Sequence, residues 1–410
     1  MVVIRKTKRL LKDINYIFGL DSMGNVPYFS SSLSKVLREL FSQVKNLKVI
    51  EDELALYVKV GNNNNQKPII VDTHLDHPGF VIGENKVVHS LGSFLFSKMI
   101  NKINFPDKLP VGYYSNSGHL ITTGFLYLFE VVGSQITARY QTESNVDLPK
   151  NTQVMPIFKT GLDRDILKLR SADNLATVFV CLNLINKLKE SEDINITFVF
   201  SKIEEIFQFS ASGISKRSAT PFEKILPNTP IIVLEVAPVL SKTQASNGDL
   251  AVASHENNFE TLNPDSTIYK QLVDSCREHK VKLHHSQLHS HGNSIAYKLI
   301  SGNQETICLH AGSFNRHNVD DDHNFAAEYV YLSSLYNLAK VTETMAVSLT
   351  KNYPNQQNKA ILNKNEKAKK SQLLSAFTRA YPRLKFNKLY PKTILEYIYF
   401  AYYTILSRLY

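Results

Sequence analysis

Apolar residues recur at two periods along the chain, and together they predict alternating helices and strands. Helical spacing covers residues 6–46 in two stripes, and the second helix is expected to start near the serines at 30–32, because Ser favours helix N-termini. Residues 54–60 alternate between apolar and other side chains, which is the period of a half-buried strand. Short apolar runs predict buried strands at 68–72, 194–200, 230–235 and 305–311. Helical spacing returns after Asp173, and it predicts further helices at 266–279 and 326–341. This alternation predicts an α/β fold in which helices sandwich a mostly parallel sheet.

The segment from residue 78 to residue 165 has a different pattern, made of short alternating β runs with Gly and Pro breaks. It shows no helical spacing, which predicts a small all-β, barrel-like domain inserted into the α/β domain. After residue 350 the chain is first polar and rich in Asn and Lys, and then regains apolar and aromatic residues. The predicted divisions are a discontinuous α/β domain at 1–77 and 166–350, the β insertion at 78–165, a linker at 351–370 and a basic, helical C-terminal extension at 371–410.

The positive charge of the chain is concentrated in its C-terminal region. The formal net charge is +10, and from Asn355 onward eleven Lys and Arg stand against two Glu, which contributes +9 and leaves +1 for the preceding residues. This even balance of the body argues against nucleic acid as a partner. The basic and aromatic extension fits binding to a membrane surface or a protein partner, and it fits equally well packing on its own body or an oligomer contact.

Composition and cysteine usage predict a cytoplasmic globular protein. Hydrophobic residues make up 43% of the chain and charged residues 20%, the ordinary balance of a folded soluble domain. Apolar runs stay shorter than the roughly 18 to 20 residues of a membrane span, and the first residues lack the pattern of a secretory signal. The cysteines Cys181, Cys276 and Cys308 lie far apart, which predicts buried thiols and neither disulfides nor a thiolate zinc site.

Five short segments carry the side chains that commonly bind metal ions. Four of them follow, or lie at the end of, an apolar run that predicts a buried strand. In open α/β sheets ligands collect beyond the carboxyl ends of the strands, so these segments are expected to meet there. The segments are THLDHPGF at 73–80, SADNLAT at 171–177, KIEEIF at 202–207, VLEVAP at 233–238 and NRHNVD at 315–320.

Each segment taken alone has an ordinary interpretation beside the functional one. His74 and Asp76 point the same way on an extended stretch, where one can bind a metal while the other orients it, but a polar loop explains them too. Asp173 opens a helix and is either an N-cap or a carboxylate that bridges two cations. The adjacent Glu204 and Glu205 repel each other unless cations neutralise them, although two solvated charges would not need a metal.

The last two segments carry one candidate ligand each. Glu235 interrupts an apolar run, and a buried carboxylate there needs a partner, either a metal or an Arg or Lys. His317 follows the strand at 305–311, where a single histidine is more often structural. The conjunction of all five segments makes a bimetallic site the better interpretation, in which one of the paired Glu residues binds a metal and its neighbour acts as general base.

In this order the segments resemble the co-catalytic metallo-aminopeptidase clan, and most closely the family of tetrahedral, glutamyl and deblocking aminopeptidases. That family carries HxDE(I/V)GF, an inserted β-barrel, a DD or DN helix start, EE, a carboxylate after a strand and a late His. The corresponding residues here are HLDHPGF, the β insertion, ADN, EE, LE and RH, and the resemblance covers roughly residues 5–345.

The resemblance implies a cytoplasmic aminopeptidase that hydrolyses the N-terminal residues of peptides through a water bridging two divalent metal ions, with self-association into oligomers. Zinc suits the N and O ligands, and cobalt or manganese are alternatives. One metal would be bound by His74, Asp173 and Glu235, and the other by Asp173, Glu205 and His317. The general base would be Glu204, and the carboxylate that orients the site would be Asp76.

Three features depart from the family pattern. His77 stands where the family usually has Glu, and Glu235 stands where it more often has Asp. The segment before the last strand contains His284, His285, His289 and His291, which form either an extra metal site or substrate contact, or a polar loop with only His291 as a candidate substrate contact near the site. Two other functions therefore stay open: a related amidohydrolase or deacylase acting on a non-peptide amide, and a catalytically silent scaffold that binds partners through its C-terminal tail.

Overall fold

The computed structural model describes nine stretches of the chain, from residue 14 to residue 375. These are residues 14–61, 66–92, 102–132, 135–206, 208–256, 259–288, 292–352, 367–372 and 374–375. Residues 14–21 form the first described helix, and residues 367–372 and 374–375 are also helical. The other helices are α2 (Ser31–Ser42), α3 (Ala172–Leu188), α4 (Phe209–Arg217), α5 (Lys242–Ser246), α6 (Thr267–His279), α7 (Asn293–Ser301) and α8 (Leu332–Asn352), with the 3-10 turns η1 (Glu84–Lys86) and η3 (Arg316–Asn318).

A central sheet of twelve described strands runs through the larger domain in the order β1-β2-β12-β3-β13-β17-β18-β11-β10, and β14 joins β17 to β15 and β16. Its strands are β1 (Leu47–Glu51), β2 (Ala55–Val60), β3 (Ile69–His74), β10 (Gly161–Asp163), β11 (Ile166–Leu169), β12 (Ile196–Ser201), β13 (Ile231–Ala237), β14 (Leu250–Glu256), β15 (Phe259–Glu260), β16 (Leu283–Leu288), β17 (Thr306–Phe314) and β18 (Glu328–Tyr331).

The centre of this sheet is parallel and its outer parts are largely antiparallel. Strands β12, β3, β13 and β17 run parallel to one another, whereas β1, β2, β18, β11 and β10 pair antiparallel. Short connections such as the one from β1 to β2 allow only antiparallel pairing, because a parallel pair needs a long crossover. The predicted α/β class is confirmed, with a sheet that is mixed as a whole.

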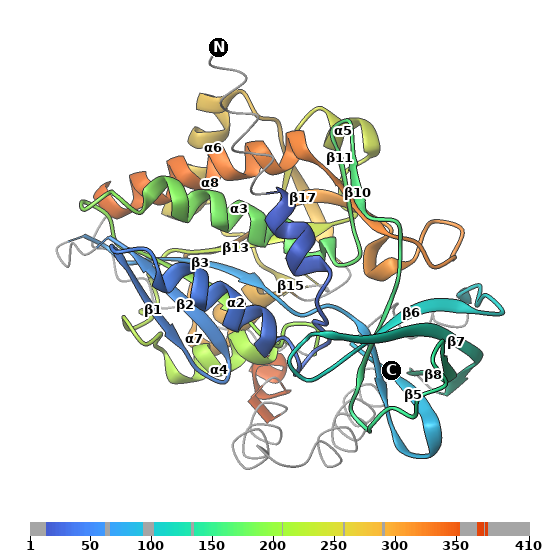
Figure 1. Cartoon of the computed structure of the whole chain (residues 1–410). Helices are drawn as coiled ribbons and strands as arrows, with labels where there is room; N and C mark the ends of the chain where they lie inside the picture. Colours follow the sequence, from blue (N-terminus) through green and yellow to red (C-terminus); the bar gives the residue numbers. More distant parts are fainter. Residues whose placement is uncertain are drawn as a thin grey trace.

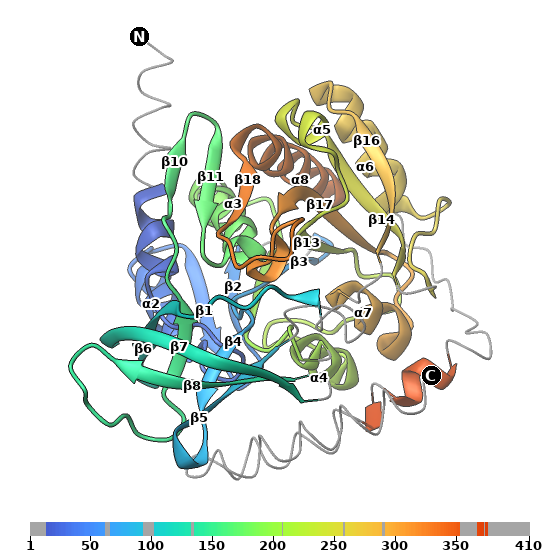
Figure 2. The same ribbon diagram turned by 90° about the vertical axis from the view of Figure 1, so that its right-hand side faces the viewer.

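Helices cover both faces of the sheet (Figures 1 and 2). The helices α2, α3, α6 and α8 share one hydrophobic cluster with the sheet, and α4 and α7 share the second cluster on the opposite face. Strand β2 contributes Leu56 and Val58 to the first cluster and Tyr57 to the second. The prediction of a half-buried strand at 54–60 was therefore wrong, because β2 lies between two neighbours and is covered on both faces.

The inserted β domain is a closed barrel with the strand order β4-β5-β8-β7-β6-β9, as the sequence predicted. It lies beside the larger domain at the lower right of Figure 1. Its core is a third hydrophobic cluster, to which Phe80, Tyr113 and Leu126 contribute. The strands are β4 (Gly79–Ile82), β5 (Val87–Leu91), β6 (Leu109–Tyr114), β7 (Leu120–Val132), β8 (Gln135–Thr142) and β9 (Gln153–Pro156).

Several local predictions differ from the structure. Helix α2 begins at Ser31 as expected, but the Ser30 hydroxyl donates to the carbonyl of Lys202 at 2.8 Å instead of capping the helix. The helix predicted at 326–341 is preceded by β18 and starts only at Leu332, because Glu328 and its neighbours pair with β11. Of the predicted polar loop at 284–291, residues 284–288 belong to strand β16, which pairs with β14 at the sheet edge, and residues 289–291 lie outside the described stretches.

The C-terminal region is described only in part. Most of the predicted linker at 351–370 and nearly all of the extension at 371–410 lie outside the described residues. Leu374 is partly buried against the hydrophobic cluster that α4 and α7 share. No helix within the described stretches is long and apolar enough to cross a membrane.

Candidate metal centre

The predicted ligands meet at the carboxyl ends of the parallel strands. His74 is the last residue of β3, and Glu204 and Glu205 follow β12. Glu235 lies near the end of β13, and His317 lies in η3 just after β17. Asp173 is at the start of α3, shortly after β11. Because β12, β3, β13 and β17 are adjacent and parallel, their ends bring these segments to one edge of the sheet.

Three side chains form a first ligand group, made of His74, Asp173 and Glu235. Their ligand atoms all lie within 4.8 Å of one another. The Nε2 atom of His74 is 3.3 Å from Oδ1 of Asp173 and 3.4 Å from Oε2 of Glu235. All three residues are buried, so the atoms face one another and not bulk solvent.

A second ligand group consists of Asp173, Glu205 and His317, again with all ligand atoms within 4.8 Å. The Nε2 atom of His317 is 3.3 Å from Oε1 of Glu205 and 3.5 Å from Oδ2 of Asp173. Asp173 thus faces the first group with one oxygen and the second group with the other. Glu204 forms a third group with His74 and Glu205, whose ligand atoms also lie within 4.8 Å of one another, and its Oε2 is 3.9 Å from Nε2 of His74.

Buried polar atoms without hydrogen-bond partners mark both groups. Among the described residues, Oδ1 of Asp173 and Oε1 of Glu235 lack a partner in the first group, and Oε1 of Glu205 and Nε2 of His317 lack one in the second. A buried carboxylate or imidazole that makes no hydrogen bond is costly, and an ion is one of the few explanations for it. Nitrogen and carboxylate oxygen atoms are donors that suit zinc and related divalent metals. The residues present therefore fit two divalent ions.

The two adjacent glutamates have opposite electrostatic environments. Burial raises the pKa of Glu204 well above its usual value, and repulsion by Glu205 and Glu235 adds to the increase. Burial opposes ionisation of Glu205 too, but the facing His317 lowers the pKa of its carboxyl group. Neighbouring carboxyl groups whose pKa values are pushed apart are typical of an acid–base pair with divided roles. Glu204 is thus the better proton carrier and Glu205 the better permanent anion.

The shared carboxylate is held ionised. Burial works against its charge, but His317, His74 and Arg316 hold the pKa of Asp173 well below its usual value. The Nε atom of Arg316 lies 3.1 Å from Oδ2 of Asp173. Conversely, although burial disfavours the cation, Glu205 and Asp173 raise the pKa of His317 to about 9. These shifts describe a cluster with an excess of negative charge that attracts cations.

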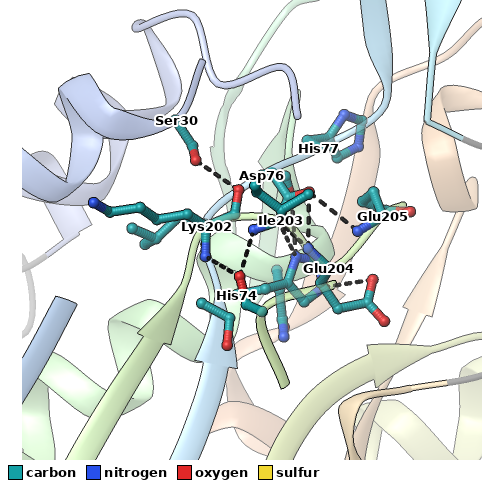
Figure 3. A network of polar contacts seen from close by, with 12 residues as sticks. Ser30, His74, Asp76, His77, Lys202, Ile203, Glu204 and Glu205 are labelled. Carbon is teal, nitrogen blue, oxygen red and sulfur yellow. Dashed lines mark hydrogen bonds and ion pairs between the residues drawn. The ribbon is translucent and has the colours of Figure 1, made fainter. Parts of the chain in front are cut away.

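Asp76 supports the site through two different groups, as Figure 3 shows. Its carboxylate accepts the backbone N–H of Glu204 at 2.9 and 3.1 Å and that of Glu205 at 3.1 Å. Its backbone carbonyl lies 2.9 Å from Nδ1 of His74, which turns Nε2 toward the two ligand groups. Asp76 therefore determines where the two glutamates and the imidazole stand relative to one another.

A buried polar cluster beneath the site was missed at the sequence level. Asp72 accepts hydrogen bonds from Ser201 at 2.8 Å, Tyr297 at 2.9 Å and Asn293 at 3.2 Å, and burial raises its pKa to about 7. A carboxylate at the end of the apolar run 68–72 carries the same signal that singled out Glu235. The sequence analysis also did not identify Arg316, which contacts Asp173, or Glu328, which accepts the backbone N–H groups of Asp173 and His317.

The histidine-rich segment contributes nothing to the described ligand groups. His284 is 2.8 Å from Asp249, and Nε2 of His285 is 2.9 Å from the hydroxyl of Tyr269. Both lie on β16, and neither joins a metal-binding group among the described residues. His289 and His291 lie outside the described stretches, so the predicted substrate contact at His291 stays a prediction.

The buried carboxyl group of Glu256, next to the site, is expected to make the stability of the protein depend on pH. It is wholly buried at the end of β14, accepts the N–H of Gly292 at 2.8 Å and contacts the hydroxyl of Ser294. Burial raises its pKa from 4.5 to about 7, so the fold prefers the protonated form, and stability is lost as the pH rises from 4.5 through 7. We expect Glu256→Gln to remove up to about 1.4 kcal/mol per pH unit of this loss, because Gln stays neutral. Urea unfolding of the metal-free protein at pH 5, 6 and 7 measures how the free energy of unfolding changes with pH. An equal change in the variant and in the wild type would contradict the prediction.

Among known proteins, the chain is similar to solved structures and not to any family model or curated sequence. No protein-family model and no curated sequence matches the chain. Solved structures do match, over most of both chains. An aminopeptidase of the archaeon Desulfurococcus kamchatkensis has a TM-score of 0.66 at 13% identity, covering 86% of this chain and 99% of the other.

The chain has the fold of the TET aminopeptidases. A TET aminopeptidase from a marine-sediment thaumarchaeon matches with a TM-score of 0.63 at 12% identity, over 82% of this chain and 96% of the other. The TET1 peptidase of Pyrococcus horikoshii matches with a TM-score of 0.59 at 13% identity, over 82% and 99%. That peptidase can assemble into a tetrahedron or a large octahedral shell. Nearly the whole length of each TET protein is therefore matched.

Proposed function

We propose that this protein is a dinuclear metal-dependent aminopeptidase that removes N-terminal residues from peptides. The observation that carries the proposal is the pair of ligand groups that share Asp173, with orphaned buried ligand atoms in each. The TET fold supports it, because the predicted ligands stand at the strand ends of a fold that solved aminopeptidases share. His74, Asp173 and Glu235 would hold one ion, and Asp173, Glu205 and His317 the other.

The proposed chemistry is the addition of water to a peptide carbonyl. When bound, the metal ions supply Lewis acidity, which polarises the carbonyl and acidifies water. Glu204 accepts the proton of the attacking water as the new C–O bond forms, and then donates it to the leaving amine as the C–N bond breaks. Burial raises the pKa of the Glu204 carboxyl group, which favours its taking up a proton from water. Asp76 holds Glu204 in place by accepting its backbone N–H.

Three finer points belong to the same proposal. Zinc is the proposed metal, with cobalt or manganese as substitutes, since N and O ligands do not distinguish sharply among them. The protein is proposed to act in the cytoplasm and to associate with further copies of itself, as the P. horikoshii peptidase does. The even charge balance of the body supports peptides over nucleic acid as the substrate.

Metal analysis combined with a substrate panel tests the proposal. We expect about two equivalents of zinc per chain after reconstitution and hydrolysis of aminoacyl p-nitroanilides with a free α-amine. Chelation should abolish the activity, and added zinc or cobalt should restore it. Turnover of N-acyl amino acids alone would replace the aminopeptidase with a deacylase. Less than about half an equivalent of metal, with no amide hydrolysed, would leave only the silent scaffold.

A further inference from the structure

One buried carboxylate contacts two of the three chain segments that supply the second ligand group. Glu328 is the first residue of β18 and is wholly buried. One of its oxygens accepts the backbone N–H of Asp173 at 2.8 Å, and the other accepts the backbone N–H of His317. Glu328 itself is not part of any metal-binding group among the described residues. It therefore touches two predicted ligands through their backbones, at the point where distant parts of the chain meet.

The position of Glu328 is itself well anchored. Its backbone pairs with Leu169 across β11 and β18, four residues before Asp173. His77 stands beside it, with Nε2 3.2 Å from Oε1 of Glu328 and Nδ1 donating to the carbonyl of Pro78 at 2.8 Å. The rings of His77 and His317 are nearly perpendicular, with centroids 6.2 Å apart. Glu328 thus acts from a paired strand on the start of helix α3 at Asp173 and on the 3-10 turn η3 at His317.

The backbone of His317 needs such a contact. Its φ of 56° lies in the left-handed region, which is unfavourable for a residue with a side chain. The flanking Asn315 and Asn318 have φ values of 59° and 62°, so three of four consecutive residues are in this region. A strained conformation persists only where surrounding contacts over-determine it. Acceptance of the N–H of His317 by a fixed carboxylate is a contact of this kind.

We propose that Glu328 is a positioning residue that sets the affinity of the second ligand group for its metal, by holding Asp173 and His317 at the separation that metal binding requires. This inference rests on the proposed dinuclear function. His74 and Glu235, which complete the first group, sit on the central strands β3 and β13 and do not depend on Glu328. Glu328 contacts two of the three ligands of the second group and only Asp173 of the first, so loss of the contact should weaken the second metal more than the first.

The test is a Co²⁺ titration of the wild-type protein and of Glu328→Gln, in which calorimetry and the visible spectrum of bound cobalt measure metal binding. Gln offers one acceptor oxygen in place of two, and its amide nitrogen opposes the N–H of a ligand residue. We expect the weaker of the two cobalt equivalents to bind about 10- to 100-fold less tightly, the usual effect of losing an outer-shell contact. The tighter equivalent should change by less than about threefold.

Glu305→Gln is the matched control. Glu305 is also a buried carboxylate that accepts two backbone N–H groups, those of Thr267 and Ile268 at the start of α6, remote from the ligand groups. The Glu305→Gln variant should lose about as much stability in urea unfolding as Glu328→Gln does, and it should bind both cobalt equivalents with wild-type affinity. Glu328→Asp keeps the charge but cannot span both N–H groups, and it serves if the Gln variant fails to fold.

A double-mutant cycle with His317→Ala assigns the affected metal. In the His317→Ala background only one equivalent should bind, and adding Glu328→Gln should leave its affinity unchanged. Equal weakening of both equivalents, or unchanged affinities in Glu328→Gln, would overturn the positioning role while leaving the dinuclear proposal in place. A wild-type protein that binds no metal would instead remove the proposed function.

Discussion

Replacing Glu204 by Gln is expected to lower kcat by a factor of about 100 to 10,000, the usual contribution of a general acid–base group. The amide keeps the size of the side chain and cannot accept a proton. Its backbone N–H still bonds to Asp76, so the loop that carries Glu205 should stay in place. Metal content, measured by elemental analysis, and KM should therefore remain close to wild type.

The neighbouring glutamate provides the comparison. Glu205→Gln removes a ligand and not the base, so it should lose metal from the second group together with activity. The two substitutions lie one position apart in the sequence, and elemental analysis should find less metal in Glu205→Gln than in Glu204→Gln. Substantial kcat in Glu204→Gln, or loss of metal from it, would show that Glu204 is not the proton carrier.

Removing Asp173 should eliminate both metals, which is the second large effect that we expect. Asp173 is shared by the first group (with His74 and Glu235) and the second group (with Glu205 and His317), so Asp173→Ala deprives each of a carboxylate oxygen. Activity should fall by at least about 1,000-fold, since the metals account for several kcal/mol of transition-state stabilisation and each 1.36 kcal/mol is tenfold in rate.

His317→Ala is the matched variant, because it belongs to the second group alone and should retain about one equivalent of metal. Thermal unfolding gives an independent measurement. Saturating zinc should raise the Tm of wild type clearly, that of His317→Ala less, and that of Asp173→Ala hardly at all, since only a ligand that binds the folded state stabilises it. Two retained equivalents in Asp173→Ala would refute the bridging assignment.

The elements that the sequence predicted well are those whose pattern is local. The central strands β3, β12, β13 and β17 were visible as apolar runs, because strands buried on both faces are apolar throughout. Polar residues that follow such a run stood out against it, and this is how Glu204, Glu205 and His317 were found. The barrel was recognisable because its short alternating strands show no helical spacing until α3 begins.

The failed predictions concern strands that form through pairing with distant parts of the chain. β16 carries two histidines and a Gln, and it is a strand because it pairs with β14 along the sheet edge. The strand before α8 was hidden by the helical spacing that follows it. In both cases backbone pairing with a distant strand outweighs the preference of the residues themselves, which a one-dimensional pattern does not record.

The sequence by itself determined which residues are available as ligands and that they follow buried strands, because burial imposes a local apolar pattern on each strand. Only the tertiary structure decided how they group. It places the two oxygens of Asp173 toward different ligand groups, separates Glu204 from Glu205 electrostatically, and brings Glu328 against the backbones of Asp173 and His317. These relations depend on the order of strands in the sheet and on burial within a few ångströms, and both arise from contacts between residues far apart in the chain.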